Sequence, residues 1–282
     1  MNDSYRLAGV MGWPVAHSHS PVLHRYWLER HGLAGDYVKL AVPPQRLGPA
    51  LRALPNLGFA GCNLTIPHKE LALTFIDEVD PEARIIGAVN TIIVRSNGKL
   101  RGMNSDAFGF IANLHAEAPN WRPGAGPAVV LGAGGAARAV VSALLAAGVP
   151  QLRLVNRHQE RAVTLKSAFD GNIEITPWDQ RSAALDGAAL LVNATSLGMA
   201  GGPALDLPLD RLPAEAVVND IVYTPLETPL LAAARRRGNR VVDGLGMLMH
   251  QGRLGFSAWF GIEPEVTPAL RARMAATLTR RS

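Results

Sequence analysis

The chain has little cysteine and no long apolar segment. Cys62 is the single cysteine among 282 residues, so no internal disulfide can form, which agrees with a reducing compartment. The longest apolar runs, such as residues 139–149, are shorter than the roughly 20 residues that a transmembrane helix needs. No apolar stretch with a cleavage site follows the polar residues 1–6, so no secretory signal is expected. These absences predict a cytoplasmic protein without a membrane partner.

Lysine is scarce as well. Only four of the 28 basic residues are lysines, namely Lys39, Lys69, Lys99 and Lys166. Because lysine loses its proton far more readily than arginine does, a lysine in so arginine-rich a chain is a candidate for acid–base chemistry. The net charge of +5 suits an anionic ligand or a nucleic acid. The arginines are scattered apart from residues 235–237, so no nucleic-acid partner is expected.

Short apolar segments alternate with helical patterns in two series, which a proline- and glycine-rich stretch at residues 119–127 separates. A helix is expected to begin with Ser20 as its N-cap and Pro21 at its first position, and to stop near Gly32. This alternation predicts α/β layers with mainly parallel sheets. Strands are expected at 7–12, 37–42, 61–66, 91–95, 128–131, 152–155, 190–192, 217–220 and 241–242, and further helices at 105–116 and 136–147.

The stretch "VVLGAGGAARA" has the spacing G-x-G-x-x-A at Gly132, Gly134 and Ala137, directly after a predicted strand and at the start of a predicted helix. In that context the glycines allow a tight turn, and the amino end of the helix receives a pyrophosphate. Gly135 and Ala136 open the same helix. The pattern predicts a dinucleotide-binding turn.

The next predicted strand ends in "VNRHQER" rather than in the acidic residue that would bind a free ribose 2′-hydroxyl. Asn156, Arg157 and Arg161 offer an amide and two guanidinium groups, which suit a 2′-phosphate, so NADP is favoured over NAD. Two further strand ends, "NATSLGM" and "DGLGM", place Thr195, Gly244 and Met247 where a nicotinamide would lie.

Many short polar side chains follow the predicted strands of the first series. They include Ser18, Ser20, Asn63, Thr65 and Asn90, with Lys69 and Asp106 as the charged members. Neutral hydrogen-bonding groups of this kind are typical of a site for a small polyol. Moving a hydride from a carbinol to NADP requires a base for the hydroxyl proton and a group that holds the base. Lys69 can be the base if its pKa is lowered, and Asp106 can orient it or share the proton. An ion pair that merely fastens two loops is the alternative.

No metal site is expected. His17 and His19 are two residues apart, which would make a strained pair of ligands, and the neighbouring motifs add no carboxylate or cysteine.

The ordered motifs "HSHSP", "NLTIPHK", "GAVNT", "NSD", "GAGGAARA", "NATSLGM", "DIVYTPLETPLL" and "DGLGMLMHQ" resemble the shikimate dehydrogenase family nearly from end to end. The resemblance implies NADP-dependent interconversion of shikimate and 3-dehydroshikimate, on the route to chorismate and the aromatic amino acids. It implies that Ser18 and Ser20 hold the substrate carboxylate, with Tyr223 reaching that side. It further implies that Asn63, Thr65, Asn90, Asp106 and Gln251 contact the hydroxyls, with Lys69 and Asp106 as the catalytic pair.

The family pattern also implies a two-domain α/β fold. A substrate domain at 1–105 would be completed by residues 246–282, and a Rossmann-type NADP-binding domain at 106–245 would be separated from it by a deep cleft. A quinate/shikimate dehydrogenase that uses NAD and a non-catalytic shikimate-binding sensor are the alternatives. The expected partner is a small-molecule substrate, and the sequence leaves a monomer or a homodimer open.

Overall fold

The computed structural model of the chain describes residues 5–279 and divides it into two compact units. The first unit comprises Met1–Ser105 and Leu248–Met274, and the second comprises Asp106–Met247 and Ala275–Ser282. Residues 1–4 and 280–282, which the predicted first domain includes, lie outside the described residues. The assignment of substrate binding to one domain and of NADP binding to the other stays a prediction at this point.

The sheet of the first unit has the strand order β2-β1-β3-β5-β6-β4. β1 runs parallel to β2 and β3, whereas β5 is antiparallel to both β3 and β6. The strands are β1 (Arg6–Gly12), β2 (Gly35–Ala41), β3 (Phe59–Leu64), β4 (Glu78–Val79), β5 (Thr91–Val94) and β6 (Leu100–Met103). The helices are α1 (Ser20–Arg30), α2 (Leu47–Ala53), α3 (His68–Leu71) and α4 (Pro81–Ile86), and α9 (Gly244–Phe260) and α10 (Pro268–Thr279) contribute to both units.

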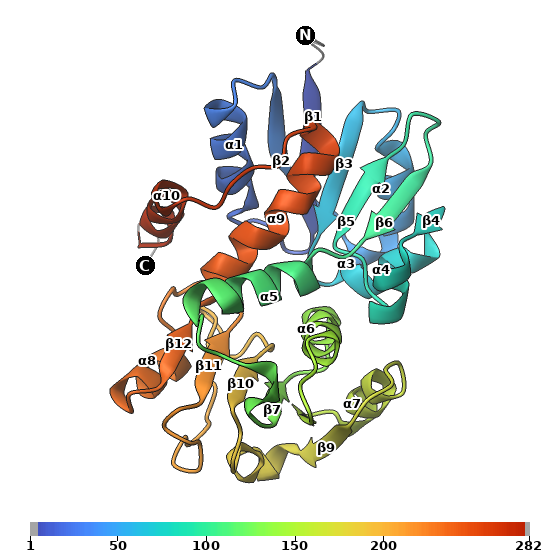
Figure 1. Cartoon of the computed structure of the whole chain (residues 1–282). Helices are drawn as coiled ribbons and strands as arrows, with labels where there is room; N and C mark the ends of the chain where they lie inside the picture. Colours follow the sequence, from blue (N-terminus) through green and yellow to red (C-terminus); the bar gives the residue numbers. More distant parts are fainter. Residues whose placement is uncertain (1–4, 280–282) are drawn as a thin grey trace. The chain divides into compact units, whose positions relative to one another are not determined.

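Alternate residues of β3 face opposite sides of this sheet. Cys62 and Leu64 belong to the apolar core with Leu47 and Leu51 of α2. Asn63 faces the other side, where α1 and the later turns of α9 lie (Figure 1). The candidate site residue Asn63 therefore lies on a strand whose opposite face packs in the apolar core.

Gly61 of β3 allows α9 to approach the sheet closely. The indole Nε1 of Trp259 donates to the carbonyl oxygen of Ile92 at 2.9 Å. A Cβ on Gly61 would lie 2.0 Å from that oxygen and 2.3 Å from the indole nitrogen. Only glycine leaves room for this bond between the last third of the chain and the first sheet.

His24 of α1 lies inside an aromatic cluster in the first unit. Its ring stacks on Tyr37 at a centroid distance of 4.0 Å and on Phe256 at 6.0 Å, and it contacts Trp27 edge-on. Burial lowers the pKa of His24 to about 3, so the ring is neutral in the folded protein near neutral pH. The cluster accepts a titratable ring only in its uncharged form.

His24→Phe is expected to make stability less sensitive to acid. Because the folded pKa lies below the unfolded one, the unfolded chain binds the extra proton between about pH 3 and 6.5, and wild-type stability falls as the pH falls through that window. Between pH 7 and 5 the wild type should lose about 2 kcal/mol relative to the variant. Urea unfolding of both proteins at several pH values measures this difference, and a constant difference would contradict it.

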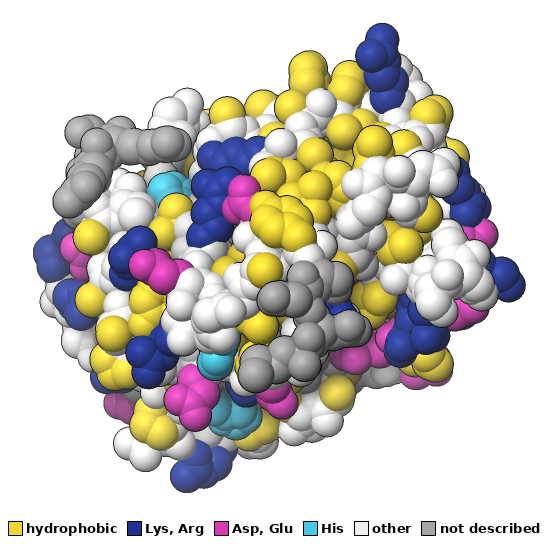
Figure 2. All heavy atoms as spheres, turned by 90° about the horizontal axis from the view of Figure 1, so that it is seen from above, with side chains coloured by type: hydrophobic (Ala, Val, Ile, Leu, Met, Phe, Trp, Pro, Cys, Tyr) yellow, Lys and Arg dark blue, Asp and Glu magenta, His cyan; other side chains and the backbone are white. Residues whose placement is uncertain are grey.

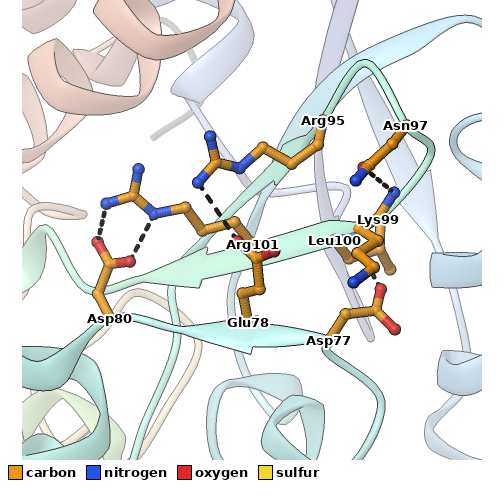
Figure 3. Close-up of polar contacts among 8 residues, drawn as sticks. All are labelled: Asp77, Glu78, Asp80, Arg95, Asn97, Lys99, Leu100 and Arg101. Atoms are coloured by element: carbon orange, nitrogen blue, oxygen red, sulfur yellow. Dashed lines mark hydrogen bonds and ion pairs between the residues drawn. The ribbon is translucent and has the colours of Figure 1, made fainter.

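Charged side chains cover the edge of the first sheet at β4. Figure 3 shows acidic residues beside β4 that contact the hairpin of β5 and β6. Paired charges at an edge strand discourage pairing with another chain. The contacts are Arg101 with Asp80 at 2.6 and 2.8 Å, Arg95 with Glu78 at 3.3 Å, and the backbone nitrogen of Leu100 with Asp77 at 2.8 Å.

The second unit contains a parallel sheet with the order β12-β11-β10-β7-β8-β9, which is the Rossmann arrangement. On one face, Leu230 and Leu231 of the helix before β12 pack with Val129 and Leu131. The strands are β7 (Ala128–Leu131), β8 (Leu152–Asn156), β9 (Ile173–Pro177), β10 (Leu190–Asn193), β11 (Val217–Asp220) and β12 (Arg240–Val242). The helices are α5 (Asp106–Glu117), α6 (Gly135–Ala146), α7 (Gln159–Lys166) and α8 (Pro229–Arg236).

The predicted fold class is confirmed, with corrections in detail. The first sheet is mixed: three of its five strand pairs are parallel, as expected of a mainly parallel sheet, whereas β5 is antiparallel to both of its neighbours. The short turn between β5 and β6 permits only antiparallel pairing. β4, β6 and β9 were not predicted. Ser20 is the first residue of α1 and not its N-cap; His19 occupies that position and its side chain makes no capping bond. Gly32, with φ +60°, follows the helix as predicted.

Candidate active site

Ser18 and Ser20 lie together at the start of α1. Their hydroxyl oxygens are 3.3 Å apart, and the Oγ of Ser18 also accepts from the backbone nitrogen of Ser20 at 3.3 Å. Both side chains are largely buried. Two hydroxyls beside the amino end of a helix are suited to a carboxylate.

Asn63 is held by three partners at the end of β3. Its Oδ1 accepts from the hydroxyl of Tyr37 at 2.7 Å. Its Nδ2 donates to the carbonyl of Asn90 at 3.1 Å and to the Oγ1 of Thr91 at 3.0 Å. These bonds fix the positions of the amide oxygen and the amide nitrogen, so the side chain of Asn63 is oriented before any ligand binds.

A second amide cluster joins segments far apart in the sequence. The Nδ2 of Asn90 and the Oγ of Ser105 both donate to the Oε1 of Gln251, at 3.0 and 3.2 Å. The Oδ1 of Asn90 accepts from the backbone nitrogen of Ser105 at 2.8 Å. Within the described residues the Nε2 of Gln251 makes no hydrogen bond. Gln251 thus uses its acceptor inside the protein, which leaves its amide N–H donors able to bind a ligand.

Lys69 belongs to α3, the short helix after β3, and its backbone oxygen accepts from Val89 at 2.8 Å. This bond holds the lysine beside the segment that carries Asn90. Thr65 lies between β3 and α3, where its backbone nitrogen donates to Met11 at 2.9 Å. Asp106 is buried, follows Ser105 directly and begins α5. Lys69 belongs to the first unit and Asp106 to the second.

His68, the neighbour of Lys69, was not singled out from the sequence. Its Nε2 lies 2.8 Å from the carbonyl oxygen of Val42, and burial lowers its pKa. A neutral ring bonded to a carbonyl carries its proton on Nε2. His68 therefore places no positive charge beside the lysine.

The glycine turn of the second unit fits a dinucleotide. Gly132 has φ +109°, and a Cβ there would lie 2.9 Å from the carbonyl oxygen of Ala194. Gly134 is the N-cap of α6, and a Cβ there would meet nothing within 4 Å. Gly135 and Ala136 form the first turn of α6, and Ala137 is buried beneath it. The turn leaves a space in front of the helix, where a pyrophosphate would accept from backbone N–H groups.

The end of β8 carries the predicted phosphate-binding residues. The Nδ2 of Asn156 donates to the carbonyl of His158 at 2.8 Å, which shapes the turn into α7. Arg157 and Arg161 are exposed, and Arg157 makes no ion pair in the described part of the chain. Arg157, His158 and Glu160 line a surface depression with the next turn of α7. The arrangement offers guanidinium groups to a phosphate in solvent-accessible surroundings.

A buried polar network links the ends of β10 and β11. Asn193 and Asp220 are register partners, and the Nδ2 of Asn193 donates to the Oδ1 of Asp220 at 2.9 Å. The Oγ1 of Thr195 donates to the Oδ1 of Asn193 at 2.7 Å. Burial raises the pKa of Asp220 to about 6, although the hydroxyl of Thr228 and two N–H donors oppose the shift. Thr195 was predicted as a cofactor residue, whereas Asp220 was seen only as the end of a strand.

The remaining predicted residues lie around the start of α9. A Cβ on Gly244 would be 2.2 Å from the carbonyl oxygen of Ile221, so the helix begins tightly against the segment after β11. Asp243 caps the helix by accepting from the backbone nitrogen of Leu245 at 3.0 Å. Met247 is buried, and Tyr223 is half-buried.

No group of three or more His, Cys, Asp or Glu side chains in residues 5–279 could hold a metal ion. None of the described helices combines the length and apolar character needed to cross a membrane.

A Rossmann sheet with a dinucleotide turn, together with a unit rich in buried amides and hydroxyls, defines a two-domain dehydrogenase that acts on a carbinol. A model of the shikimate dehydrogenase substrate-binding domain matches residues 10–92, and one of shikimate/quinate 5-dehydrogenase matches residues 124–199. The chain belongs to the shikimate dehydrogenase family, which confirms the resemblance stated above.

The similarity extends over whole chains. A protein of Paramagnetospirillum magneticum named shikimate dehydrogenase (NADP(+)) is 57% identical over 96% of this chain and 99% of its own length. Shikimate 5-dehydrogenase of Thermus thermophilus, solved with NADP(H) and shikimate, has a TM-score of 0.84 at 40% identity, covering 98% of this chain and 99% of that one. Quinate dehydrogenase of Corynebacterium glutamicum, solved with NAD, has a TM-score of 0.87 at 30% identity, covering 98% and 100%.

Proposed function

We propose that the chain catalyses the reversible NADP-dependent reduction of 3-dehydroshikimate to shikimate. The observation that carries this proposal is the end-to-end similarity, at 57% identity, to a relative named for that activity and cofactor. The glycine turn at Gly132 and Gly134 supports it because the space before α6 suits a pyrophosphate.

We assign the first unit to substrate binding and the second to NADP. Ser18 and Ser20 would receive the substrate carboxylate, with Tyr223 reaching the same group. Gln251 would donate to a substrate hydroxyl, since its Oε1 is already bonded to Asn90 and Ser105. Asn63, Thr65 and Asn90 would complete the hydroxyl contacts. The cofactor residues are the glycine turn and the other strand ends: Gly132, Gly134, Gly135, Ala136, Asn156, Arg157, Arg161, Thr195, Gly244 and Met247.

Lys69 and Asp106 are assigned to proton transfer. When bound, NADP⁺ supplies the acceptor for the hydride that leaves the carbinol carbon. Lys69 would take the hydroxyl proton as the carbonyl forms and would return it in the reverse direction. Asp106 would orient the amine or share its proton.

The test is the initial rate with shikimate and with quinate, each paired with NADP⁺ and with NAD⁺. Turnover confined to shikimate and NADP⁺ is the expected result. Equal or faster turnover with quinate or NAD⁺ would favour the quinate/shikimate alternative. The similarity to an NAD-bound quinate dehydrogenase is the observation that supports this alternative. Ligand-induced thermal shifts without turnover in any pairing would instead indicate a sensor.

We also propose a cytoplasmic location, in line with a single cysteine that is buried and unpaired. The chain would act as a monomer or a homodimer, which light scattering of the purified protein distinguishes. Basic side chains on the face seen in Figure 2 lie in small groups interspersed with acidic ones rather than in one continuous stripe. This distribution supports a small-molecule partner rather than a nucleic acid.

A further inference from the structure

Asp220 is a fully buried carboxylate that none of the proposed roles uses. Its relative exposure is 0%, and among the described residues no cation lies within ion-pair distance of it. Burying an unpaired carboxylate opposes folding, because the charge loses its hydration. This penalty makes Asp220 a candidate for a role other than stabilising the fold.

The carboxylate of Asp220 accepts hydrogen bonds from the end of β10 and from the segment between β11 and α8. Its Oδ1 accepts from Asn193 at 2.9 Å and from the backbone nitrogen of Val222 at 3.0 Å. Its Oδ2 accepts from the Oγ1 of Thr228 at 2.7 Å, and Thr228 caps α8 through the backbone nitrogen of Leu231. The loop after β10, the segment after β11 and the start of α8 therefore share one acceptor group.

An ionised carboxylate only accepts hydrogen bonds, so Asp220, together with the carbonyl of Leu197, requires the Nδ2 of Asn193 on its side. With its Nδ2 bonded to Asp220 and to the carbonyl of Leu197 at 3.0 Å, Asn193 turns its Oδ1 toward Thr195. That oxygen accepts from the backbone nitrogen and the Oγ1 of Thr195, at 3.1 and 2.7 Å. The carboxylate of Asp220 and the carbonyl of Leu197 together set the direction of this chain of bonds.

The loop fixed in this way touches the dinucleotide turn. A Cβ on Gly132 would meet the carbonyl oxygen of Ala194 at 2.9 Å and the Cγ2 of Thr195 at 3.1 Å. Any rotation of the Asn193 amide that released Thr195 would let this loop shift against the first glycine of the turn. We infer that Asp220 is a positioning residue for the cofactor site, acting through Asn193 to hold Ala194 and Thr195 against Gly132.

This inference rests on the proposed function for the identity of the cofactor. The test measures binding of NADP⁺ and of shikimate to the full chain by calorimetry at pH 8, together with the Tm. D220N leaves one acceptor oxygen in place of two and removes the charge that strengthens the bond from Asn193, and we expect it to weaken NADP⁺ binding about tenfold. Shikimate affinity should stay within about twofold, and the Tm should not fall, because a buried charge is removed.

Two further variants distinguish a role of Asp220 in positioning the cofactor site from a general loss of order around the carboxylate. Thr228→Val removes a donor from the same carboxylate on its α8 side and should leave NADP⁺ affinity near the wild-type value. Asn193→Ala should weaken NADP⁺ binding as D220N does, and combining the two should add little, since Asp220 acts through Asn193. If D220N folds poorly, Asn193→Ala against Thr228→Val still decides the matter.

Normal NADP⁺ affinity in both D220N and Asn193→Ala would overturn the inference, as would parallel losses of NADP⁺ and shikimate binding or additive effects of the two changes. If the wild type binds NAD⁺ instead of NADP⁺, the proposed function fails on its cofactor, and the same comparisons made with NAD⁺ still test Asp220. A wild type that binds neither dinucleotide overturns both proposals.

Discussion

Lys69→Met is expected to lower kcat for shikimate oxidation by about a thousandfold, within the range of roughly 10²–10⁴ that a positioned acid–base group contributes. Methionine keeps an unbranched side chain of similar length in half-buried surroundings but cannot accept a proton. The backbone bond from Val89 to residue 69 does not depend on the side chain, so the fold and NADP⁺ binding should be unchanged. Steady-state kinetics, calorimetry with NADP⁺ and the Tm together measure this prediction.

Lys99→Met is the matched control, since it removes the same charge from an exposed position before β6. It should leave kcat within about twofold of the wild type, as expected for a surface substitution away from any site. If Lys69→Met retains a normal kcat, the lysine is not the acid–base group of the reaction. Equal losses in both variants would show that total charge, rather than Lys69, is responsible.

The double variant Arg157→Ala/Arg161→Ala is expected to raise KM for NADP⁺ about a hundredfold. Each guanidinium that bonds a phosphate contributes roughly 1.5–3 kcal/mol, and shared contacts make the sum smaller than two full bonds. Because NAD⁺ lacks the 2′-phosphate, its KM should change little. The two KM values for each protein, measured with saturating shikimate, give the ratio directly.

Lys166→Ala is the control for this second prediction, because it removes a positive charge from the opposite end of the same helix, α7. It should leave the preference for NADP⁺ intact. If the double variant raises both KM values equally, the arginines act on the fold of the turn and not on the phosphate. If neither KM changes, specificity for the phosphate lies elsewhere.

Local patterns predicted the conformation of the glycine turn well. The strand β7, the turn at Gly132 and Gly134 and the helix α6 are contiguous in sequence, and each requirement is imposed by backbone geometry within about a dozen residues. The same holds for Pro21 in the first turn of α1 and Gly32 after its last. Short strands such as β4 escaped prediction because two residues carry no alternation.

The hydrogen-bond partners within the site could not be predicted in the same way. Asn90 and Gln251 were both named from motifs, yet they lie 161 residues apart, and only the fold shows that one amide orients the other. Ser105 was predicted only as the first residue of a helix, although its hydroxyl joins that pair. Asp220 gave no signal, because an acidic residue at a strand end looks the same whether it is exposed or buried.

The bond from Trp259 to Ile92 has a consequence for the order in which the chain can fold during synthesis. The sheet that contains β1 to β6 is complete once residue 103 has left the ribosome, but one face of it is covered by α9, which is translated more than 140 residues later. The guanidinium of Arg6 likewise cannot donate to the carbonyl of Trp259 until that residue has been synthesised. The strands of the second unit, from β7 to β12, arise from one uninterrupted stretch. The first sheet is therefore synthesised first, but its packing is completed last. A nascent chain released early would expose the apolar surface beneath Trp259.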